Sequence, residues 1–229
     1  MRTIDSQALH PIRESASWEA YLSRRYAILF YSLLLMLVLI PIAATIGLPQ
    51  TAIKFLLGGC LLAAVIPNGT TRTRYLLVGG VVLLVALRFA SDQGYLQVSS
   101  GLLLAIIGLI GLLAAAGTLG FAVSAEKVDS ETIYAALSTY LLAGLFFGQI
   151  YWSIEQVWPG SITGPDPVSD ARTVYYSFVT LATLGYGDYL PRTDLVRGIA
   201  TFEVVGGQLF LAVMVARLIG VFEIEKKSG

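Results

Sequence analysis

Six consecutive residues, Thr183-Leu184-Gly185-Tyr186-Gly187-Asp188, carry the strongest chemical signal in the sequence. Glycine at alternate positions permits backbone conformations that are closed to residues bearing a Cβ atom. A short extended segment of this kind can aim successive carbonyl oxygens at one axis. Several such segments around that axis form oxygen cages that replace the hydration shell of an ion. The hydroxyl of Thr183 would add one oxygen layer, and the ring of Tyr186 could point away and brace the segment. The chemistry indicated is coordination of a dehydrated cation by main-chain oxygens.

A second candidate is Glu203, a carboxylate inside a long apolar stretch. An ionisable residue within a membrane span is a functional hypothesis by default. Glu203 could form hydrogen bonds behind the six-residue segment, face a cavity and attract cations, or carry a proton. The single cysteine, Cys60, and the single histidine, His10, exclude an intrachain disulfide and a four-ligand zinc site. We find no nucleophile–base set and no glycine-rich phosphate loop, so we expect neither an enzyme nor a bound cofactor.

The composition places these residues in a membrane protein. Of the 229 residues, 56% are hydrophobic and only 13% are charged, which is about half the charged fraction of an average soluble domain. Too few charges remain to cover a water-facing surface. The 15 basic and 15 acidic residues give a formal net charge of zero, which argues against a nucleic-acid partner. Membrane lipids are the expected surroundings.

The elements that must position the candidate residues are apolar helices, each needing about 20 residues to cross a bilayer. Six segments qualify, of which the second and third are short: 26–46, 51–66, 75–89, 98–125, 133–158 and 195–222. A further apolar run over 173–182 has ten residues, too few to cross, and is typical of a re-entrant helix. Ser130 and Asp170 are candidate N-caps for the helices that follow them. We therefore expect an all-α integral membrane fold with six transmembrane helices and one re-entrant helix.

Basic residues in the loops predict the orientation. With the N-terminus inside and six alternating spans, nine Lys and Arg residues fall inside and five outside. The inner set is Arg2, Arg13, Arg24, Arg25, Arg72, Arg74, Lys127, Lys226 and Lys227, and the outer set is Lys54, Arg88, Arg172, Arg192 and Arg197. This bias predicts that both termini are cytoplasmic. Tyr151, Trp152 and Trp158 are expected near the outer headgroups, as an aromatic belt.

The segment 183–188 resembles the potassium-channel signature Thr-Val-Gly-Tyr-Gly-Asp in five residues of six, with Leu184 in place of valine. The resemblance extends over about 133–222, which would comprise the outer helix, pore helix, filter and inner helix of that family. Tyr175 and Tyr176 stand where the family's pore helix carries aromatic residues that pack around the filter tyrosine. On the following span, Gly206 and Gly207 resemble the hinge of the family's inner helix.

The resemblance implies a potassium-selective channel in the plasma membrane, built as a homotetramer with one filter strand from each subunit. Potassium ions would be the permeant ligand and would bind to backbone carbonyl oxygens, those of Thr183, Leu184, Gly185 and Tyr186. Gly187 would allow the outer turn, Asp188 would anchor the outer mouth, and Gln208 would face the cavity below the hinge.

The implied domain order follows the spans. It comprises a cytoplasmic or interfacial segment (1–25), a peripheral four-helix domain (26–125), a linker (126–131), a pore domain (132–223) with its pore helix at 173–182 and filter at 183–188, and a tail (224–229). The span count resembles the voltage-gated cation-channel superfamily, whose fourth helix carries repeated arginines. Here the fourth span has no charge over 102–117, so we expect no strong intrinsic voltage sensing. Gly108 and Gly111 in this span suit close helix packing instead. Because only seven residues follow Phe222, we expect no cytoplasmic regulatory domain.

Two alternatives stay open at this point. The Leu184 substitution leaves a weakly selective monovalent cation channel as one alternative, because it changes the packing around the predicted filter. A non-conducting regulatory or scaffold subunit is the other. A potassium transporter is disfavoured, because such families join several pore-loop repeats in one chain and this sequence has one.

Overall fold

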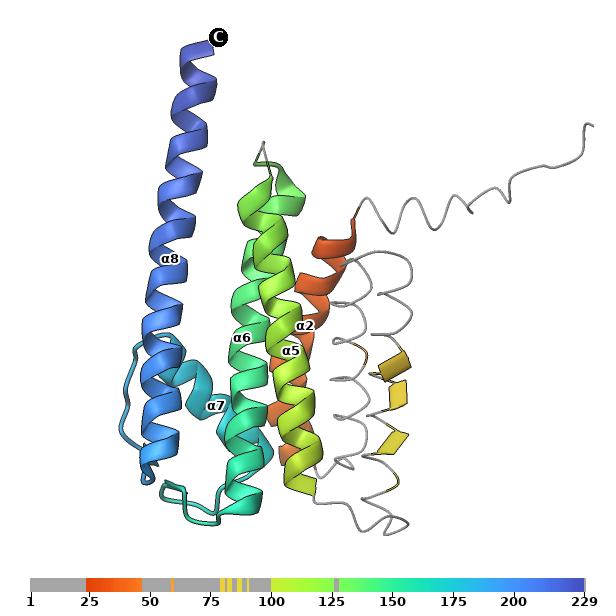
Figure 1. Ribbon diagram of the computed structural model, residues 1–229, viewed down its shortest axis with the longest axis vertical. Helices are drawn as coiled ribbons and strands as arrows, with labels where there is room; N and C mark the ends of the chain where they lie inside the picture. The colour runs from red at the N-terminus through yellow and green to blue at the C-terminus, as the bar shows by residue number, and fades with distance from the viewer. Residues whose placement is uncertain are drawn as a thin grey trace, which may run out of the picture.

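The structure is a computed structural model that describes residues 24–46, 100–125 and 128–228, with isolated positions between 59 and 90. Within these residues the fold is an upright bundle of helices (Figure 1). The long helices are α2 (Arg25–Thr45), α5 (Ser100–Ser124), α6 (Ser130–Val157) and α8 (Asp194–Ser228). All four are long and apolar enough to cross a membrane. The spans predicted over 51–66 and 75–89, and the predicted N-terminal segment 1–25 apart from its last two residues, lie outside the described residues.

The helices α5 and α6 form an antiparallel pair whose contact depends on small residues (Figure 1). A Cβ atom built on Gly111 would lie 2.1 Å from Cγ of Phe146, and one built on Gly108 would lie 2.7 Å from Cγ1 of Ile150. Only hydrogen at these positions lets the helices approach this closely, as is common where lipid removes the hydrophobic drive for association. The predicted close packing of Gly108 and Gly111 is therefore confirmed.

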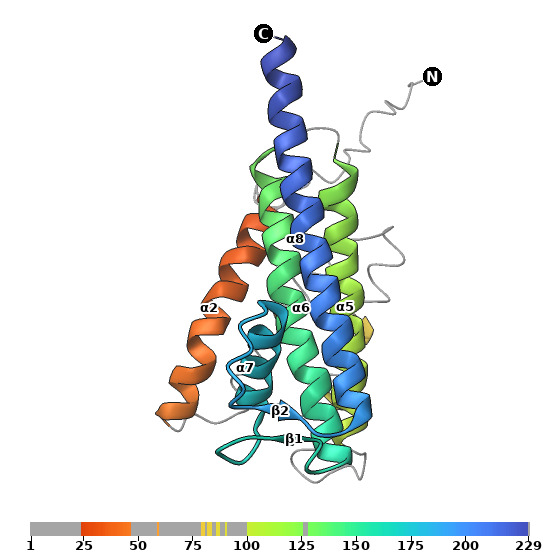
Figure 2. The ribbon, with the colours of Figure 1, turned by 90° about the vertical axis from the view of Figure 1, so that its left-hand side faces the viewer.

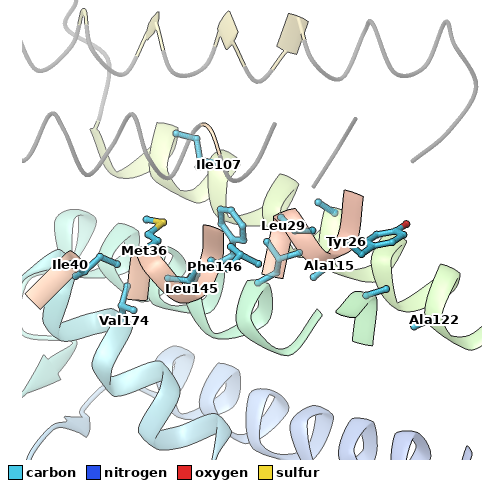
Figure 3. Packing of buried hydrophobic residues seen from close by; sticks show 14 residues of the cluster. Tyr26, Leu29, Met36, Ile40, Ile107, Ala115, Ala122, Leu145, Phe146 and Val174 are labelled. Carbon is cyan, nitrogen blue, oxygen red and sulfur yellow. The ribbon is translucent and has the colours of Figure 1, made fainter. Parts of the chain in front are cut away.

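The larger apolar core lies where α2 packs against the α5–α6 pair (Figure 3). Leu29 and Met36 of α2, Ala115 of α5 and Phe146 of α6 are all buried there. Val174, from a shorter helix described below, belongs to the same cluster. The peripheral helices and the region that follows α6 therefore share one core within the chain.

At one end of the bundle, two hydrogen bonds join helices in pairs, α2 with α6 and α8 with the end of α5. The amide of Tyr26 at the start of α2 donates to Oε2 of Glu131 at the start of α6, over 2.9 Å. The guanidinium of Arg217 in α8 donates to the carbonyl of Ala125, just past the end of α5. Because α2 and α6 begin at this end while α5 ends there, these helices alternate in direction, as successive spans must.

Both predicted N-caps are displaced by one residue. The cap of α6 is Asp129 rather than Ser130, and its Oδ1 accepts a hydrogen bond of 2.8 Å from the Thr132 amide. This amide holds the pKa of the Asp129 carboxyl below its ordinary value. Asp170 is likewise the first helical residue of its helix, and the cap position belongs to Ser169, which has extended backbone. In each pair the first residue has the extended conformation that a cap requires.

The loop between α6 and α8 is organised at the opposite end of the bundle. Two short strands, β1 (Ile162–Thr163) and β2 (Leu190–Pro191), pair in antiparallel fashion and lie beside the start of the short helix α7 (Figure 2). The carboxylate of Glu155, in the last turns of α6, accepts hydrogen bonds from the amides of Gly160 and Ile162 at 2.6 and 3.0 Å. The loop after α6 is therefore fixed to α6 at one end and to β2 at the other.

Candidate ion-conduction site

The short helix α7 (Asp170–Leu181) occupies the place where the sequence predicts a re-entrant helix over 173–182. Its 12 residues span about 18 Å at ~1.5 Å per residue, too short for a hydrocarbon core of about 30 Å. It packs on two glycines of α6, because a Cβ on Gly148 would lie 2.7 Å from Cα of Val174 and one on Gly144 would lie 2.5 Å from the Phe178 ring. The helix thus packs along α6 and ends partway along the bundle (Figure 2).

The chain leaves α7 through hydrogen bonds to its last turn. The Thr183 amide donates to the Thr180 carbonyl over 2.9 Å, and the Leu184 amide donates to the Val179 carbonyl over 2.9 Å. These bonds satisfy carbonyl groups that a helix end would otherwise leave unpaired. The start of the segment 183–188 is therefore fixed relative to the helix before it.

Backbone dihedrals alternate along this segment. Thr183, Gly185 and Gly187 have φ values of 58°, 58° and 76°, and among the described residues Thr183 is the only non-glycine with positive φ. Positive φ is unusual for a β-branched residue and costs on the order of 1–3 kcal/mol. Every second residue thus has left-handed backbone while Leu184 and Tyr186 between them do not. In an ordinary extended strand, successive carbonyl groups point in opposite directions. The alternation of left-handed and ordinary backbone turns them toward the same side.

The segment has little cover from its own chain. Residues 183–188 are all exposed, with Leu184 54% and Tyr186 66% accessible. Large side chains such as those of Leu184 and Tyr186 usually pack against other groups. These side chains are therefore available to groups outside this chain.

The Asp188 end of the segment is held by a tyrosine of α7. The hydroxyl of Tyr175 donates to Oδ2 of Asp188 over 2.7 Å, and Oδ1 of Asp188 accepts from the Tyr189 amide at 3.0 Å. The Tyr175 and Tyr189 rings meet edge to face with centroids 6.1 Å apart. Asp188 is thereby fixed at the position where the chain leaves the segment.

The other predicted filter aromatic, Tyr176, lies on a different side of α7. Tyr176 is buried, and its ring meets the Tyr151 ring of α6 edge to face at 4.9 Å. Among the described residues, the Tyr186 ring pairs with neither Tyr175 nor Tyr176. Tyr151 itself is fully buried, so its predicted place in an outer aromatic belt is wrong, whereas Trp158 is 58% exposed.

Glu203 of α8 lies in a cluster that joins three helices, α6, α7 and α8. It is 1% exposed and its Oε2 accepts a hydrogen bond of 2.7 Å from the Tyr151 hydroxyl of α6. Its Oε1 lies 2.5 Å from Oγ of Ser177 in α7, and the same Oγ lies 2.7 Å from the Gly144 carbonyl oxygen of α6. Of the alternatives left open by the sequence, hydrogen bonding between helices is what the structure shows, and Glu203 does not face a cavity in this chain.

The predicted hinge and cavity residues of α8 have two different surroundings. Gly207 is buried, and a Cβ built on it would lie 2.7 Å from Cδ1 and 3.1 Å from the carbonyl oxygen of Leu181, the last residue of α7. Gly206 has open space around it, and Gln208 is exposed. Gly207 therefore lets α8 approach the end of α7, while Gly206 and Gln208 face away from the chain.

Two members of the Glu203 cluster, Tyr151 and Ser177, were not identified as site residues from the sequence. A serine in a short apolar helix and a buried tyrosine give no local signal, because their partners lie 26 and 52 residues away in the chain. The one usable signal was Glu203 itself, since a carboxylate inside a span must find hydrogen-bond donors.

Residues 136–223 match a protein-family model described as an ion channel. This match begins in the second turn of α6 and covers α7, the segment 183–188 and most of α8. No curated protein and no solved structure matches the chain. Together with the four long apolar helices, the similarity supports an integral membrane protein with a domain for passive ion transport.

Proposed function

We propose that this chain is one subunit of a homotetrameric, potassium-selective channel whose filter is the segment 183–188. The observation that carries the proposal is the alternation of positive φ at Thr183, Gly185 and Gly187 in an exposed segment at the end of a buried, non-spanning helix. Stacked carbonyl oxygens around one axis are the chemistry that selects K⁺ in channels. Neither glycine position would accept another residue without strain.

Two further features favour a cation at this place. The carbonyl end of α7 points at the start of the segment, and a helix C-terminus carries about half a negative elementary charge. The carboxylate of Asp188 lies at the other end, fixed by Tyr175. A cation entering the segment would therefore meet negative potential at both ends, with the carbonyls of Thr183, Leu184, Gly185 and Tyr186 between.

The exposed apolar surface of α8 supports an assembly of several copies of the chain. Only 17% of the apolar span Asp194–Arg217 in α8 is buried, against 56% for α6. Large apolar residues such as Phe202, Val205 and Leu209 are exposed along it. Since one chain supplies one filter strand, a closed ring of copies is needed to surround an ion. The number four follows the potassium channels that the hexapeptide resembles.

The remaining helices would surround this pore in the lipid of a plasma membrane. The loop basic residues favour cytoplasmic termini, so β1, β2 and Asp188 would face outward. The helix α5 has no charged residue and is packed closely on α6 through Gly108 and Gly111. Intrinsic voltage sensing by α5 would need charge that it lacks.

The test is potassium flux from liposomes that contain the purified protein, comparing Gly185→Ala with Gly160→Ala. Both glycines have positive φ, 58° and 85°, and a Cβ on either would meet open space, so the local backbone strain is matched. Gly160 lies in the outer loop, away from the proposed filter. We expect Gly185→Ala to abolish flux and Gly160→Ala to retain it. Normal flux through the Gly185→Ala variant would remove the filter assignment.

Reversal potentials in opposed sodium and potassium gradients separate potassium selectivity from weak cation selectivity. A reversal potential that follows the potassium gradient supports the proposal. A reversal potential near zero in the same gradients would favour the weakly selective channel that the Leu184 substitution leaves open. Absence of flux under every condition would favour a non-conducting subunit.

A further inference from the structure

The cluster of Glu203, Ser177 and Tyr151 has more oxygen–oxygen contacts than it has hydroxyl hydrogens to fill them. Three short oxygen–oxygen contacts join it: Tyr151 to Glu203 at 2.7 Å, Ser177 to Glu203 at 2.5 Å, and Ser177 to the Gly144 carbonyl at 2.7 Å. Each contact needs one hydrogen. A carbonyl oxygen has none, while each hydroxyl has one.

Two hydroxyl hydrogens cannot fill three contacts. The Tyr151 hydrogen fills the contact to Oε2 of Glu203. If the Ser177 hydrogen is directed at the Gly144 carbonyl, the 2.5 Å contact to Glu203 has no hydrogen unless Glu203 supplies it. If Glu203 is ionised, Ser177 has one hydrogen for two contacts, one with Glu203 at 2.5 Å and one with the Gly144 carbonyl at 2.7 Å. One of these two pairs of oxygens is then left without a hydrogen between them. A neutral carboxylic acid fills all three.

The surroundings of Glu203 contain nothing to balance a negative charge. The titratable groups that face it are tyrosines, Tyr140 and Tyr151 from α6 and Tyr176 from α7. Across the described part of the chain, no basic side chain forms an ion pair with Glu203. A buried carboxylate without a cation is costly, and burial as a neutral, fully hydrogen-bonded acid avoids that cost.

We propose that Glu203 is a neutral acid that donates a hydrogen bond to Ser177 and accepts one from Tyr151, and that this latch fixes α8 to α6 and α7. In this arrangement Oε1 carries the hydrogen and Oε2 is the carbonyl oxygen. Glu203 acts as a positioning residue, since it touches Ser177, six residues before the first filter residue, and not the ion. The consequence for conduction rests on the proposed function; the protonation state does not.

Loss of that proton would rearrange the latch in a defined way. The proton would pass to water, and the Ser177 hydrogen would turn to the carboxylate. The contact between Ser177 and the Gly144 carbonyl would then lose its hydrogen, which removes this hydrogen bond between α7 and α6. The neutral acid and the attachment of the filter helix are therefore linked.

The protonation state is tested by infrared difference spectroscopy on the full-length protein in liposomes. We expect a carbonyl stretching band of a protonated carboxyl group in the wild type that is absent in Glu203→Gln. Tyr151→Phe should shift this band to higher frequency, because the carbonyl oxygen loses its donor. If Glu203→Gln fails to fold, the Tyr151→Phe shift alone identifies the band. A wild type without the band, or a band that Tyr151→Phe does not move, would overturn the neutral acid.

The positioning role is tested by potassium flux through three variants. Glutamine donates through its amide and accepts through its carbonyl, so Glu203→Gln should keep flux within about twofold of the wild type. Glu203→Ala leaves Ser177 and Tyr151 without partners in a buried site and should lower flux by about tenfold or more. Ser177→Ala, which removes the bridge to α7, should lower it by a similar factor. Wild-type flux in both alanine variants would overturn the latch.

The two measurements also separate this proposal from the function on which it rests. If the wild type shows the carboxyl band but no potassium flux at all, the neutral acid stands and the channel assignment fails. If flux is normal and potassium-selective but the band is absent, the channel stands and the latch fails.

Discussion

The helices α5 and α8 both pack along α6, but different chemistry holds each of them. The contact of α5 with α6 depends on close steric packing, with Gly111 directly against the Phe146 ring. Of the apolar span of α5, 44% is buried. The contact of α8 with α6 is made by the hydrogen bond from Tyr151 to Glu203 and by ring pairs such as Phe147 with Phe202, and 17% of its span is buried. The α5 interface buries a large part of its helix within the chain, whereas α8 touches the rest of the chain at separate points and leaves most of its surface free for further contacts.

This difference indicates where the molecule is rigid and where it depends on assembly. Shape-based packing between glycines and an aromatic ring tolerates no added atom, because interiors are close-packed. A helix held by a few hydrogen bonds can keep its position only if those groups stay paired. We therefore expect the contact of α6 with α5 to be most sensitive to added atoms, and the contact of α6 with α8 to be most sensitive to loss of polar partners.

The largest effect on stability is expected at the α5–α6 contact. Gly111→Ala would place Cβ within 2.3 Å of three Phe146 ring atoms, so we expect a loss of about 3 kcal/mol in the free energy of unfolding. Gly120→Ala is the matched control on the same helix, since its Cβ meets nothing within 4 Å. That control should be neutral or stabilise by up to about 1 kcal/mol through helix propensity. Chemical denaturation in detergent micelles measures both, and equal stability of the two variants would contradict the shape-based interface.

A smaller effect is expected where α8 approaches α7. Gly207→Ala would bring Cβ to 2.7 Å from a methyl group of Leu181, which can move, and to 3.1 Å from its carbonyl oxygen, which cannot move freely. We expect a cost of about 1–2 kcal/mol, with reduced potassium flux. Gly206→Ala, whose Cβ meets open space within one chain, is the control for monomer stability. If Gly206→Ala destabilises the isolated chain more than Gly207→Ala does, the assignment of which glycine faces α7 is wrong.

The smallest effect is expected at the start of α6, the helix that both interfaces share. Asp129→Ala removes the cap of this helix and should cost about 1 kcal/mol, whichever side of α6 is examined. The pKa of the Asp129 carboxyl is lowered by the Thr132 amide, so its contribution is fully present above the ordinary pKa of aspartate. It is lost as pH falls through the lowered pKa of the folded state. Denaturation in the acid range should show a smaller pH-dependent loss in Asp129→Ala than in the wild type, and identical acid slopes would contradict the cap.

Apolar run length was sufficient to predict the described helices. The spans predicted at 26–46, 98–125, 133–158 and 195–222 correspond to α2, α5, α6 and α8 within a few residues at most ends. The exception is the end of α8, which continues to Ser228, so that 224–228 extends a helix where the sequence suggested a tail. Apolar composition marks where a helix crosses lipid, and polar residues can continue the same helix into water.

The predictions that failed concern features that depend on the backbone conformation of a single residue. Both caps fell on the first of two adjacent capping residues, Asp129 before Ser130 and Ser169 before Asp170. Either residue of each pair can accept the hydrogen bond, so composition does not choose between them. The positive φ of Thr183 was not predictable, because the glycine pattern points only to Gly185 and Gly187 and a β-branched residue disfavours that region.

The pair of two-residue strands, β1 and β2, connects the entrance of the proposed pore to the loop that follows α6. From the Glu155 carboxylate, through β1 and β2, the chain reaches Tyr189 and Asp188 by an unbroken series of hydrogen bonds and covalent links. Asp188, at the mouth of the proposed pore, is therefore anchored to α6 as well as to the proposed filter. In the proposed channel, a molecule that bound the loop carrying β1 and displaced it would therefore move Asp188, and would change ion entry without occupying the path of the ion.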